Sequence, residues 1–424
     1  MNVLVVGSGG REHALVSCLR RTSPSTEVFC APGNAGIAAD ATVFAASAED
    51  AGGIEALRAE VETRSIDLTI VGPEAPLVAG LTDRFRTAGL RVFGPQRSAA
   101  QLEGSKCFTK EFLARYEIPT AAFAIFDDAA AAHAYLESQS MPIVIKADGL
   151  AAGKGVVVAA DREEARAAVE AMLVEKRLGN AGDRIVIEDC LRGSEISLFV
   201  VADGEDYVLL ETAQDYKPIF DRDRGPNTGG MGTYSPYYAV TDPVIQKARE
   251  TIIEPTLRGM AADGAPYQGF LYAGLMLTES GPQVIEFNVR FGDPEAQTVL
   301  TRFASDFTEC VERAIDGRLT GYEPRWDPRH AVCVVAASGG YPGSYEKGQP
   351  IYGLDKIDDP DVEVYHAGTA ESESGGIVTN GGRVLGVTAL GETRGVARQK
   401  VYGALERIQF EGMQFRSDIA AGVR

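Results

Sequence analysis

The amino-acid sequence predicts an α/β protein that begins with a doubly wound parallel sheet. Over residues 1–101, short apolar segments alternate with segments of helical periodicity, which is typical of parallel strands joined by helices. Each apolar segment ends in a turn rich in glycine or proline. At 424 residues the chain is too long for one ordinary core, and we expect about two to four domains.

The first predicted strand, residues 1–6, runs directly into Gly7-Ser8-Gly9-Gly10, and a helix is predicted over residues 11–20. Such a turn lets backbone N–H groups face a phosphate. Arg11 and His13 are placed to assist, although His13 is equally well explained as an ordinary histidine of a helix surface. NAD binding is disfavoured, because Glu12 stands where a dinucleotide fingerprint needs its third glycine.

The alternation continues with a strand at 68–71, a turn at 72–76, a helix over about 77–88 and a strand at 92–93. Ligands of a doubly wound sheet bind at the carboxyl ends of its strands. The glycine turns after the strands at 1–6 and 68–71 both fall there. A ligand site between these turns is therefore predicted, with two plain tight turns as the alternative.

Lysines and a glycine-rich loop predict a triphosphate site in the next region. A helix over 101–116 carries Lys106 and Lys110 one turn apart, and Lys146 ends an apolar strand, where a lysine has little structural purpose. The glycine loop at 149–155 joins this strand to the next and has Lys154 near its tip. A P-loop would need Ser or Thr after that lysine and a following helix. A glycine flap over a nucleotide is favoured over a plain hairpin. The strands expected here are 122–126, 143–146 and 156–159, with a helix at 129–137.

A short hinge between two further strands predicts contacts with a nucleoside. A helix at 163–176 leads to strands at 184–188 and 195–201, which are joined by residues 189–193. Backbone groups of such a hinge can pair with an adenine edge, and Glu195 is a candidate for the ribose hydroxyls. An exposed glutamate at the start of a strand is the alternative.

Residues 211–236 are polar and rich in glycine, and we expect a long loop there. Loops of this length inside compact domains are commonly lids or binding loops, with a plain flexible excursion as the alternative. A helix at 242–262 and a hairpin of strands at 269–277 and 283–290 follow.

The second strand of this hairpin carries the strongest chemical signal. Period-two alternation places Glu286, Asn288 and Arg290 on one face and Ile285, Phe287 and Val289 on the other. Carboxylate and amide oxygens suit Mg²⁺, which shares its remaining positions with phosphates. A guanidinium one pleat further can contact a phosphoryl group in two places. An edge strand with a solvated polar face is the alternative.

Composition excludes several classes of protein. The net charge of −19 and pI near 4.8 disfavour a nucleic-acid surface, which needs clustered basic residues. The six cysteines are scattered without zinc spacing and are expected to be buried thiols in a reducing compartment. We find neither a signal peptide nor an apolar run of membrane-spanning length, and we expect a soluble cytoplasmic protein without membrane contact.

Taken together, these segments resemble the glycinamide ribonucleotide synthetase family, also called phosphoribosylamine-glycine ligases, of the ATP-grasp superfamily. The motifs that carry the resemblance span the chain: GSGGREHAL at 7–15, GPEAPLVAG at 72–80, LEGSK at 102–106, IKADGLAAGKGV at 145–156, GPNTGGMG at 225–232, RFGDPE at 290–295, VVAASGGYPG at 334–343, HAGT at 366–369 and VTNGGRVLGVTALG at 378–391.

The resemblance implies three domains and a set of site residues. The domains are an N-terminal α/β domain at 1–101, a two-lobed ATP-grasp domain at 102–328 whose smaller mobile lobe covers about 121–192, and a small α+β C-terminal domain at 329–424. ATP is expected at Lys106, Lys146, Gly153, Lys154, Gly155, Glu188, Cys190, Leu191 and Glu195, and Mg²⁺ or Mn²⁺ at Glu286 and Asn288. Substrate is expected at Gly9, Gly10, Arg11, Glu12, Gly72, Pro73, Glu74, Asp215, Lys217, Asn227 and Gly229, and catalysis at Arg290 and Asp293.

The resemblance implies that the protein uses ATP to join glycine to 5-phosphoribosylamine, with glycyl phosphate as the intermediate. This reaction belongs to purine synthesis, and the protein is expected to be a monomer. Another ATP-grasp ligase, such as a carboxylase or a formate-using enzyme, and a non-catalytic nucleotide-binding regulator are the alternatives. Three departures from the family pattern stand out. Tyr216 replaces a common histidine, Ala296 replaces a frequent threonine, and the strand at 269–277 lacks the further metal carboxylate that many ATP-grasp enzymes have.

Overall fold

A five-stranded parallel sheet forms the first region of the computed structural model, which describes residues 1–151, 155–238 and 240–422. The strand order β3-β2-β1-β4-β5 reverses direction between β1 and β4, so the carboxyl ends of these two strands flank a crevice. The glycine turns predicted to bind a ligand follow these two strands. The strands are β1 (Asn2–Gly7), β2 (Glu27–Pro32), β3 (Thr42–Val43), β4 (Leu68–Val71) and β5 (Val92–Phe93).

Two helices that the sequence predicted as continuous are broken, each for a local reason. The helix expected at 77–88 is interrupted at Gly80, whose φ of +93° favours glycine. The helix expected at 101–116 is interrupted at Ser105, whose hydroxyl accepts the Phe108 N–H at 3.0 Å and so starts a new helix. The helices of this part are α1 (Gly10–Thr22), α2 (Ile37–Asp40), α3 (Ala51–Thr63), α4 (Glu74–Ala79), α5 (Leu81–Thr87), α6 (Gln101–Gly104) and α7 (Lys106–Arg115).

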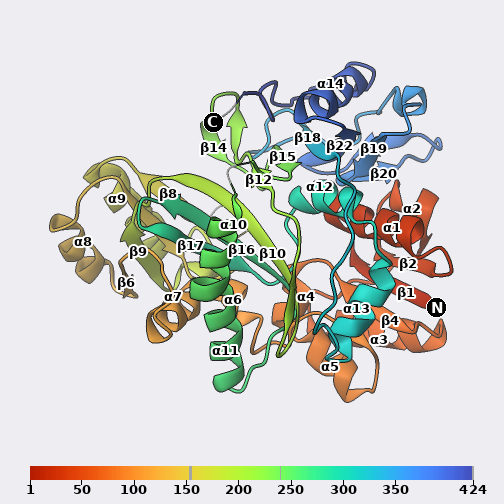
Figure 1. Cartoon of the computed structure of the whole chain (residues 1–424). Coiled ribbons are helices and arrows are strands. Elements are labelled where there is room, and N and C mark those ends of the chain that lie inside the picture. The colour runs from red at the N-terminus through yellow and green to blue at the C-terminus, as the bar shows by residue number, and fades with distance from the viewer. Residues whose placement is uncertain (152–154, 239, 423–424) are drawn as a thin grey trace.

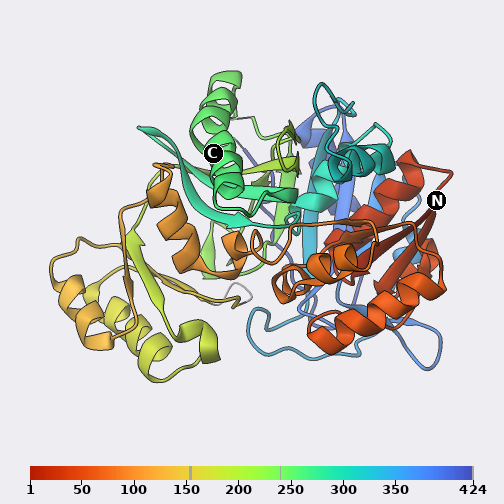
Figure 2. The ribbon, with the colours of Figure 1, turned by 90° about the horizontal axis from the view of Figure 1, so that it is seen from below.

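A smaller lobe projects from the rest of the molecule, opposite the N-terminal sheet (Figures 1 and 2). Its four antiparallel strands have the order β6-β9-β7-β8 and carry helices α8 and α9. Its core, from Ala132 to Ile187, is separate from the cores that join the other regions. The elements are β6 (Phe123–Phe126), α8 (Ala129–Glu137), β7 (Ile143–Ala147), β8 (Val156–Ala159), α9 (Arg162–Val169) with a π-helical end at Glu170–Val174, a 3-10 turn at Gly179–Gly182, and β9 (Ile185–Asp189).

A second antiparallel sheet faces this lobe in the order β11-β10-β16-β17. Its strands are β10 (Ser194–Asp203), β11 (Tyr207–Leu209), β16 (Gln268–Thr278) and β17 (Gly281–Asn288). Around it lie α10 (Asp242–Ala248) and α11 (Glu254–Ala262), joined by a π-helical turn at Arg249–Ile253, and α12 (Glu295–Arg302) and α13 (Phe307–Ile315). No helix of the described residues is long and apolar enough to cross a bilayer.

The expectation of a long loop at 211–236 is corrected by the structure, because the segment contains short strands. This segment holds β12 (Gln214–Asp215), the hairpin of β13 (Pro218–Phe220) and β14 (Arg224–Asn227), and β15 (Gly232–Ser235). β12 and β15 complete a five-stranded sheet of order β12-β15-β18-β22-β19, because β15 pairs with β18. The remaining elements are β18 (His330–Ala337), a 3-10 turn at Leu354–Lys356, β19 (Val362–His366), β20 (Thr369–Glu371), β21 (Ile377–Thr379), β22 (Arg383–Gly391) and α14 (Arg394–Leu405). The sheet thus joins segments on both sides of residue 329.

Candidate active site

A cavity of about 640 Å³ lies where the regions meet, within the size range of sites for small molecules. Its wall combines the hinge of the smaller lobe, the β16–β17 sheet, the first residue of α4 and the C-terminal region. Charged side chains of both signs line it: Arg11, Glu74, Glu103, Lys106, Lys146, Glu188, Asp189, Glu195, Asp215, Lys217, Glu286, Arg290, Asp293, Glu295 and Arg383.

A β-bulge at Ile285 changes the predicted faces of the signature strand. Gly274 of β16 pairs with Glu286 and Leu275 pairs with Val284, so Ile285 has no partner. The bulge shifts the alternation by one residue, which lets Val284 and Phe287 both pack into the core while Ile285 lines the cavity with Glu286. The prediction that Ile285 faces away from Glu286 is therefore wrong. Glu286, Asn288 and Arg290 do share the cavity, although the strand ends at Asn288.

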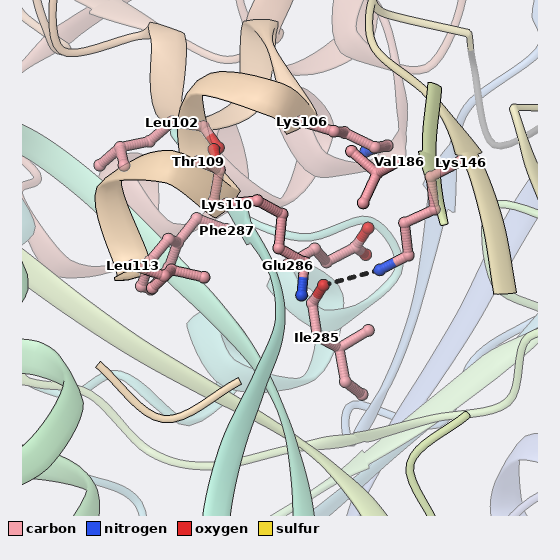
Figure 3. Close-up of a pocket in the computed structure, with 10 residues that line it drawn as sticks. All are labelled: Leu102, Lys106, Thr109, Lys110, Leu113, Lys146, Val186, Ile285, Glu286 and Phe287. Atoms are coloured by element: carbon pink, nitrogen blue, oxygen red, sulfur yellow. Dashed lines mark hydrogen bonds between the residues drawn. The ribbon is translucent and has the colours of Figure 1, made fainter. Parts of the chain in front are cut away.

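The unpaired bulge supplies an acceptor for one of the predicted lysines. Lys146 Nζ donates to the carbonyl of Ile285 at 2.9 Å and lies 2.6 Å from Glu188 Oε1. Figure 3 shows the side chains of Lys146, from β7, and Lys110, from α7, converging on this part of β17. The contact links the smaller lobe to the signature strand. Lys106, from the start of α7, lines the same cavity.

Lys110 is a site residue that sequence reasoning noted but did not assign. Its ammonium lies 2.5 Å from Glu188 Oε2 and donates to Thr120 at 2.6 Å, and both ionised side chains are almost fully buried. Burial lowers the pKa of Lys110, and the charge of Glu188 opposes this. For Glu188, burial alone would raise the pKa, but the two lysines outweigh it and lower the pKa. The contacts of Glu188 thus position Lys146, and Glu188, which was predicted to contact ATP, also lines the cavity.

Replacing Lys110 by methionine is expected to destabilise the fold by about 3 kcal/mol, because Oε2 of the buried Glu188 loses its charged partner and only Lys146 still pairs with this carboxylate. Equilibrium unfolding in urea measures this. Arg58→Met is the matched control, since Arg58 pairs with Glu55 and Glu62 on the exposed surface of α3 and its loss should change little. Equal midpoints for the two variants would contradict the proposed importance of Lys110.

Two oxygen donors on β17 fit a divalent cation. Burial alone would raise the pKa of Glu286, but Lys106, Lys217, Lys146 and Arg290 outweigh it, so the pKa is lowered and the group is a carboxylate. Among the described residues no three His, Cys, Asp or Glu side chains gather to hold a metal on their own. Mg²⁺ takes one or two protein oxygens and shares the others with phosphates, so the two oxygens of Glu286 and Asn288 match its needs. Glu286 and Asn288 would therefore hold the metal together with a bound nucleotide.

Arg290 is held between two acidic residues of different regions. Its Nε donates to Glu74 at 3.2 Å and its Nη2 donates to Glu103 at 2.7 Å. Glu103 also accepts the backbone N–H of Val289 at 2.7 Å. Burial raises the pKa of Glu103 to about 7, against the pull of Arg290. Sequence reasoning missed Glu103, although it lies inside the LEGSK motif, because a lone glutamate in a helix carries no local signal.

The glycine turns approach each other around a buried glutamate. Glu12 is 1% exposed, accepts the N–H of Gly9 at 2.6 Å and pairs with Arg11 at 2.6 Å. A Cβ on Gly72 would lie 2.1 Å from its Oε1, so only glycine fits there. Glu12 therefore holds the two glycine turns in place from the buried side. Of the predicted substrate residues in these turns, Arg11 and Glu74 line the cavity, and Gly9, Gly10, Glu12, Gly72 and Pro73 are not part of its wall.

His13 does not assist a ligand in the cavity. Its Nε2 lies 3.0 Å from Asp40, and its Nδ1 accepts the backbone N–H of His366 at 2.8 Å. The suggestion that His13 helps to bind a phosphate beside Arg11 therefore finds no support in this geometry. His13 instead joins α1 to β19 of the C-terminal region.

The stability of the protein is expected to fall between pH 6.5 and 4 partly because of His366. Burial and the neighbouring His13 lower the pKa of His366 to about 4, with Asp40 opposing them. Below pH 6.5 the unfolded chain binds this proton and the folded chain does not, so stability is lost as the pH falls, by at most about 1.4 kcal/mol per pH unit. His366→Asn should flatten the curve of unfolding free energy against pH in this range. Parallel curves for the two proteins would contradict the expectation.

A second charged cluster in the wall of the cavity is centred on Lys217. Lys217 Nζ is 2.8 Å from Glu195 and 3.3 Å from Asp215. Burial raises the pKa of Asp215 to about 7, with Lys217 opposing and Glu295 and Glu195 adding to the rise. Asn227 and Gly229 lie beside Lys217 in the wall. Glu195, predicted for the ribose, is thus paired with a lysine predicted for the substrate.

The C-terminal region contributes an arginine that sequence reasoning did not find. Arg383 Nη1 is 3.2 Å from Asp293 Oδ1 and donates to the carbonyl of Asp293 at 2.7 Å. Burial alone would raise the pKa of Asp293, but Arg383 and Arg11 outweigh it and keep the pKa low. Among the other predicted ATP residues, Gly155, Cys190 and Leu191 line the cavity, whereas Gly153 and Lys154 lie outside the described residues.

The fold and this site define an ATP-grasp protein: two antiparallel sheets enclose a cavity lined by lysines and by the side-chain oxygens of Glu286 and Asn288. Two solved structures of low identity share the fold. The biotin carboxylase complex with β,γ-ATP from Campylobacter jejuni has a TM-score of 0.75 at 14% identity, covering 99% of this chain and 94% of that chain. The biotin carboxylase domain of Hydrogenobacter thermophilus 2-oxoglutarate carboxylase, in complex with MgADP, has a TM-score of 0.74 at 16% identity, covering 98% and 91%.

The chain belongs to the phosphoribosylglycinamide synthetase family, whose N domain matches residues 1–103, ATP-grasp (A) domain 104–296 and C domain 331–422. Proteins named phosphoribosylamine--glycine ligase from Vibrio vulnificus and Neisseria meningitidis are 52% and 51% identical, covering 99% of this chain and 97% and 99% of theirs. The crystal structure of phosphoribosylamine--glycine ligase from Thermotoga maritima matches with a TM-score of 0.85 at 36% identity, covering 99% of this chain and 100% of that chain.

Proposed function

We propose that this protein is an ATP-dependent ligase that joins glycine to 5-phosphoribosylamine, giving glycinamide ribonucleotide, ADP and phosphate in purine synthesis. The observation that carries the proposal is the identity of about half of all residues to proteins named for this reaction, over 99% of the chain. The cavity has the charges that the chemistry needs. The three-domain division at 101 and 328, a monomeric state and a cytoplasmic location belong to the same proposal.

The nucleotide is proposed to lie between the smaller lobe and β17. Lys106 and Lys146 face its phosphates, and the hinge residues Cys190 and Leu191 contact its base. When bound, Mg²⁺ or Mn²⁺ on Glu286 and Asn288 supplies positive charge to the phosphate oxygens. The residues 149–151 and Gly155 line the cavity and limit the access of water, which would otherwise hydrolyse an acyl phosphate.

The first step is attack of a glycine carboxylate oxygen on the γ-phosphorus of ATP, which releases ADP and gives glycyl phosphate. Arg290 is fixed by Glu74 and Glu103 at the end of β17, so its guanidinium is ordered before the substrates bind. A preorganised cation stabilises the charge of the transferring phosphoryl group without having to reorganise. The residue thus acts on the transition state more than on ATP itself.

In the second step the amine of phosphoribosylamine attacks the glycyl carbonyl carbon, phosphate leaves and the new amide nitrogen loses a proton. The amine substrate is proposed to lie between Arg11 and Glu74 on one side and Lys217, Asn227 and Gly229 on the other. Asp293, expected near the amine, has a pKa held low by Arg383 and Arg11, which makes it an orienting acceptor and a weak base. Asp215, with a pKa raised to about 7, is better suited to accept the proton.

The test is release of ADP from ATP and Mg²⁺ with glycine, freshly generated phosphoribosylamine, both or neither. We expect ADP only with both, together with the mass of glycinamide ribonucleotide. ADP release that ignores both substrates would contradict the substrate assignment, and another carboxylate-amine ligase would then be sought. ADP release that depends on bicarbonate would indicate a carboxylase.

A further inference from the structure

Arg416 is a buried arginine whose guanidinium contacts several residues that are far away along the chain. Its side chain is completely buried, which arginine tolerates only when its charge is paired. Nε and Nη2 donate to the two carboxylate oxygens of Asp418, both at 2.8 Å. Nη1 lies 3.0 Å from Asp223 and donates to the carbonyl of Pro218, also at 3.0 Å. The guanidinium carbon lies 5.0 Å from the centre of the Tyr216 ring. One side chain therefore joins residues 416–418 to residues 216–223.

The surrounding backbone reinforces this junction. Asp418 also accepts the N–H of Arg222 at 2.8 Å, and Asp221 accepts the N–H of Ser417 at 2.8 Å. The hydroxyl of Tyr216 accepts the N–H of Ala420 at 3.1 Å. Tyr216, which departs from the family pattern, is thus part of the junction through both its ring and its hydroxyl.

Residues 416–420 are in turn fixed to α14. The hydroxyl of Tyr402 donates to the carbonyl of Arg416 at 2.8 Å and accepts the N–H of Ile419 at 3.2 Å. Arg398 donates to the carbonyls of Ser417 and Ile419 at 2.6 and 3.0 Å. Hydrogen bonds to α14 therefore hold residues 416–420 in a fixed position.

The hairpin held by residues 416–420 carries part of the active site. We define the substrate wall as Lys217, Asn227, Thr228 and Gly229, all of which line the cavity. The hairpin β13–β14 connects Lys217 to Asn227, and the Thr228 N–H and hydroxyl both donate to the carbonyl of Lys217, at 2.9 and 2.7 Å. Residues 222–227 are exposed, and in the rest of the hairpin Ile219 is the buried hydrophobic residue, packed in a small cluster with Met231 and Ala337, so the tip and β14 gain little from packing. A segment with few buried contacts is free to open locally unless specific bonds hold it.

We propose that Arg416 is a positioning residue that ties the hairpin to residues 416–420 and so fixes the substrate wall for phosphoribosylamine. The proposal rests on the proposed function for the identity of the substrate. The mechanical part of it concerns only the hairpin and can be tested without any substrate.

Arg416→Lys is the main test variant, because lysine keeps the charge but has no planar fork to meet both oxygens of Asp418 while a further nitrogen contacts Asp223 and the carbonyl of Pro218. Hydrogen exchange measured by mass spectrometry should become faster over residues 216–230 and stay unchanged over the smaller lobe. The KM for phosphoribosylamine should rise at least about fivefold while the KM for ATP stays within about twofold. Arg407→Lys is the matched control: Arg407 belongs to the same region but pairs with Asp358 at the surface, and its variant should behave as the unmodified protein.

Tyr216→Phe keeps the ring under the guanidinium and removes the hydroxyl that Ala420 contacts, so it should give a smaller change of the same kind. If exchange over 216–230 is unchanged in Arg416→Lys, the proposal is overturned. A rise in both KM values together, or exchange that becomes faster throughout the protein, would overturn it too, because each indicates a general loss of structure. If the unmodified protein forms no product, the proposed function fails, and the exchange data still decide whether Arg416 holds the hairpin.

Discussion

Replacing Arg290 by alanine is expected to lower kcat by about two to three orders of magnitude, with the KM for ATP nearly unchanged. The guanidinium lies at the end of β17 beside Glu286 and Asn288, where the γ-phosphoryl group is proposed to transfer. The contacts proposed for ATP on the smaller lobe remain in this variant, whereas the proposed stabilisation of the charge that develops during transfer is lost. Single-turnover formation of ADP, compared with equilibrium binding of a nucleotide analogue, separates the two effects.

The fold should tolerate the loss of Arg290 because Glu103 can take up a proton. Burial already raises the pKa of Glu103 to about 7, and without Arg290 its neutral form is favoured further. Arg290→Lys is the conservative comparison: it keeps one charge, loses the fork and should fall between the native protein and the alanine variant. A kcat that stays within threefold of the native value in Arg290→Ala would remove the arginine from the mechanism.

Replacing Glu286 by glutamine is expected to shift the Mg²⁺ dependence of activity to concentrations at least about tenfold higher and to lower the rate at saturation. Glutamine keeps the size of the side chain but replaces an anionic oxygen by a neutral one. The lysines that lower the pKa of Glu286 would then meet no carboxylate at this position. Initial rates measured against free Mg²⁺ at saturating ATP give the shift directly.

Gln283→Ala on the same strand is the control for Glu286→Gln, because Gln283 contacts Ser280 at the far end of the hairpin. It should leave the Mg²⁺ dependence unchanged. The proposed ligand role of Glu286 would be contradicted if both variants needed the same Mg²⁺ concentration as the native protein. The same titration with Mn²⁺ compares the two cations.

Patterns within a few residues of each other predicted most of the fold and the chemical centre of the site. Local patterns were enough to single out the turns after β1 and β4, Lys146 at the end of β7, and the group Glu286, Asn288 and Arg290. The bulge at Ile285 does not, because a register shift depends on the partner strand β16. The strands β12 and β15 were missed for the same reason, since β15 pairs with β18 far along the chain.

The residues that orient the site were harder to find than the residues that face the ligand. Glu103, Lys110 and Arg383 each lie in an element whose local pattern is ordinary, and only the tertiary arrangement brings them beside Arg290, Glu188 and Asp293. A buried charged residue looks like a surface residue in sequence, because both occupy polar positions. Its role depends on a partner residue that can lie anywhere else along the chain.

The pairing of β15 with β18 has a consequence for how the chain is made. β15 ends at Ser235 and β18 begins at His330. During synthesis, the edge of β15 therefore stays unpaired until on the order of a hundred further residues have been added. An unpaired strand edge can recruit strands of other chains. A fragment that ended near residue 328 would keep this edge permanently, and one that began at 329 would leave the edge of β18 bare. Each half is therefore expected to aggregate when it is produced alone, because the strand edge that β15 and β18 cover for each other is then open.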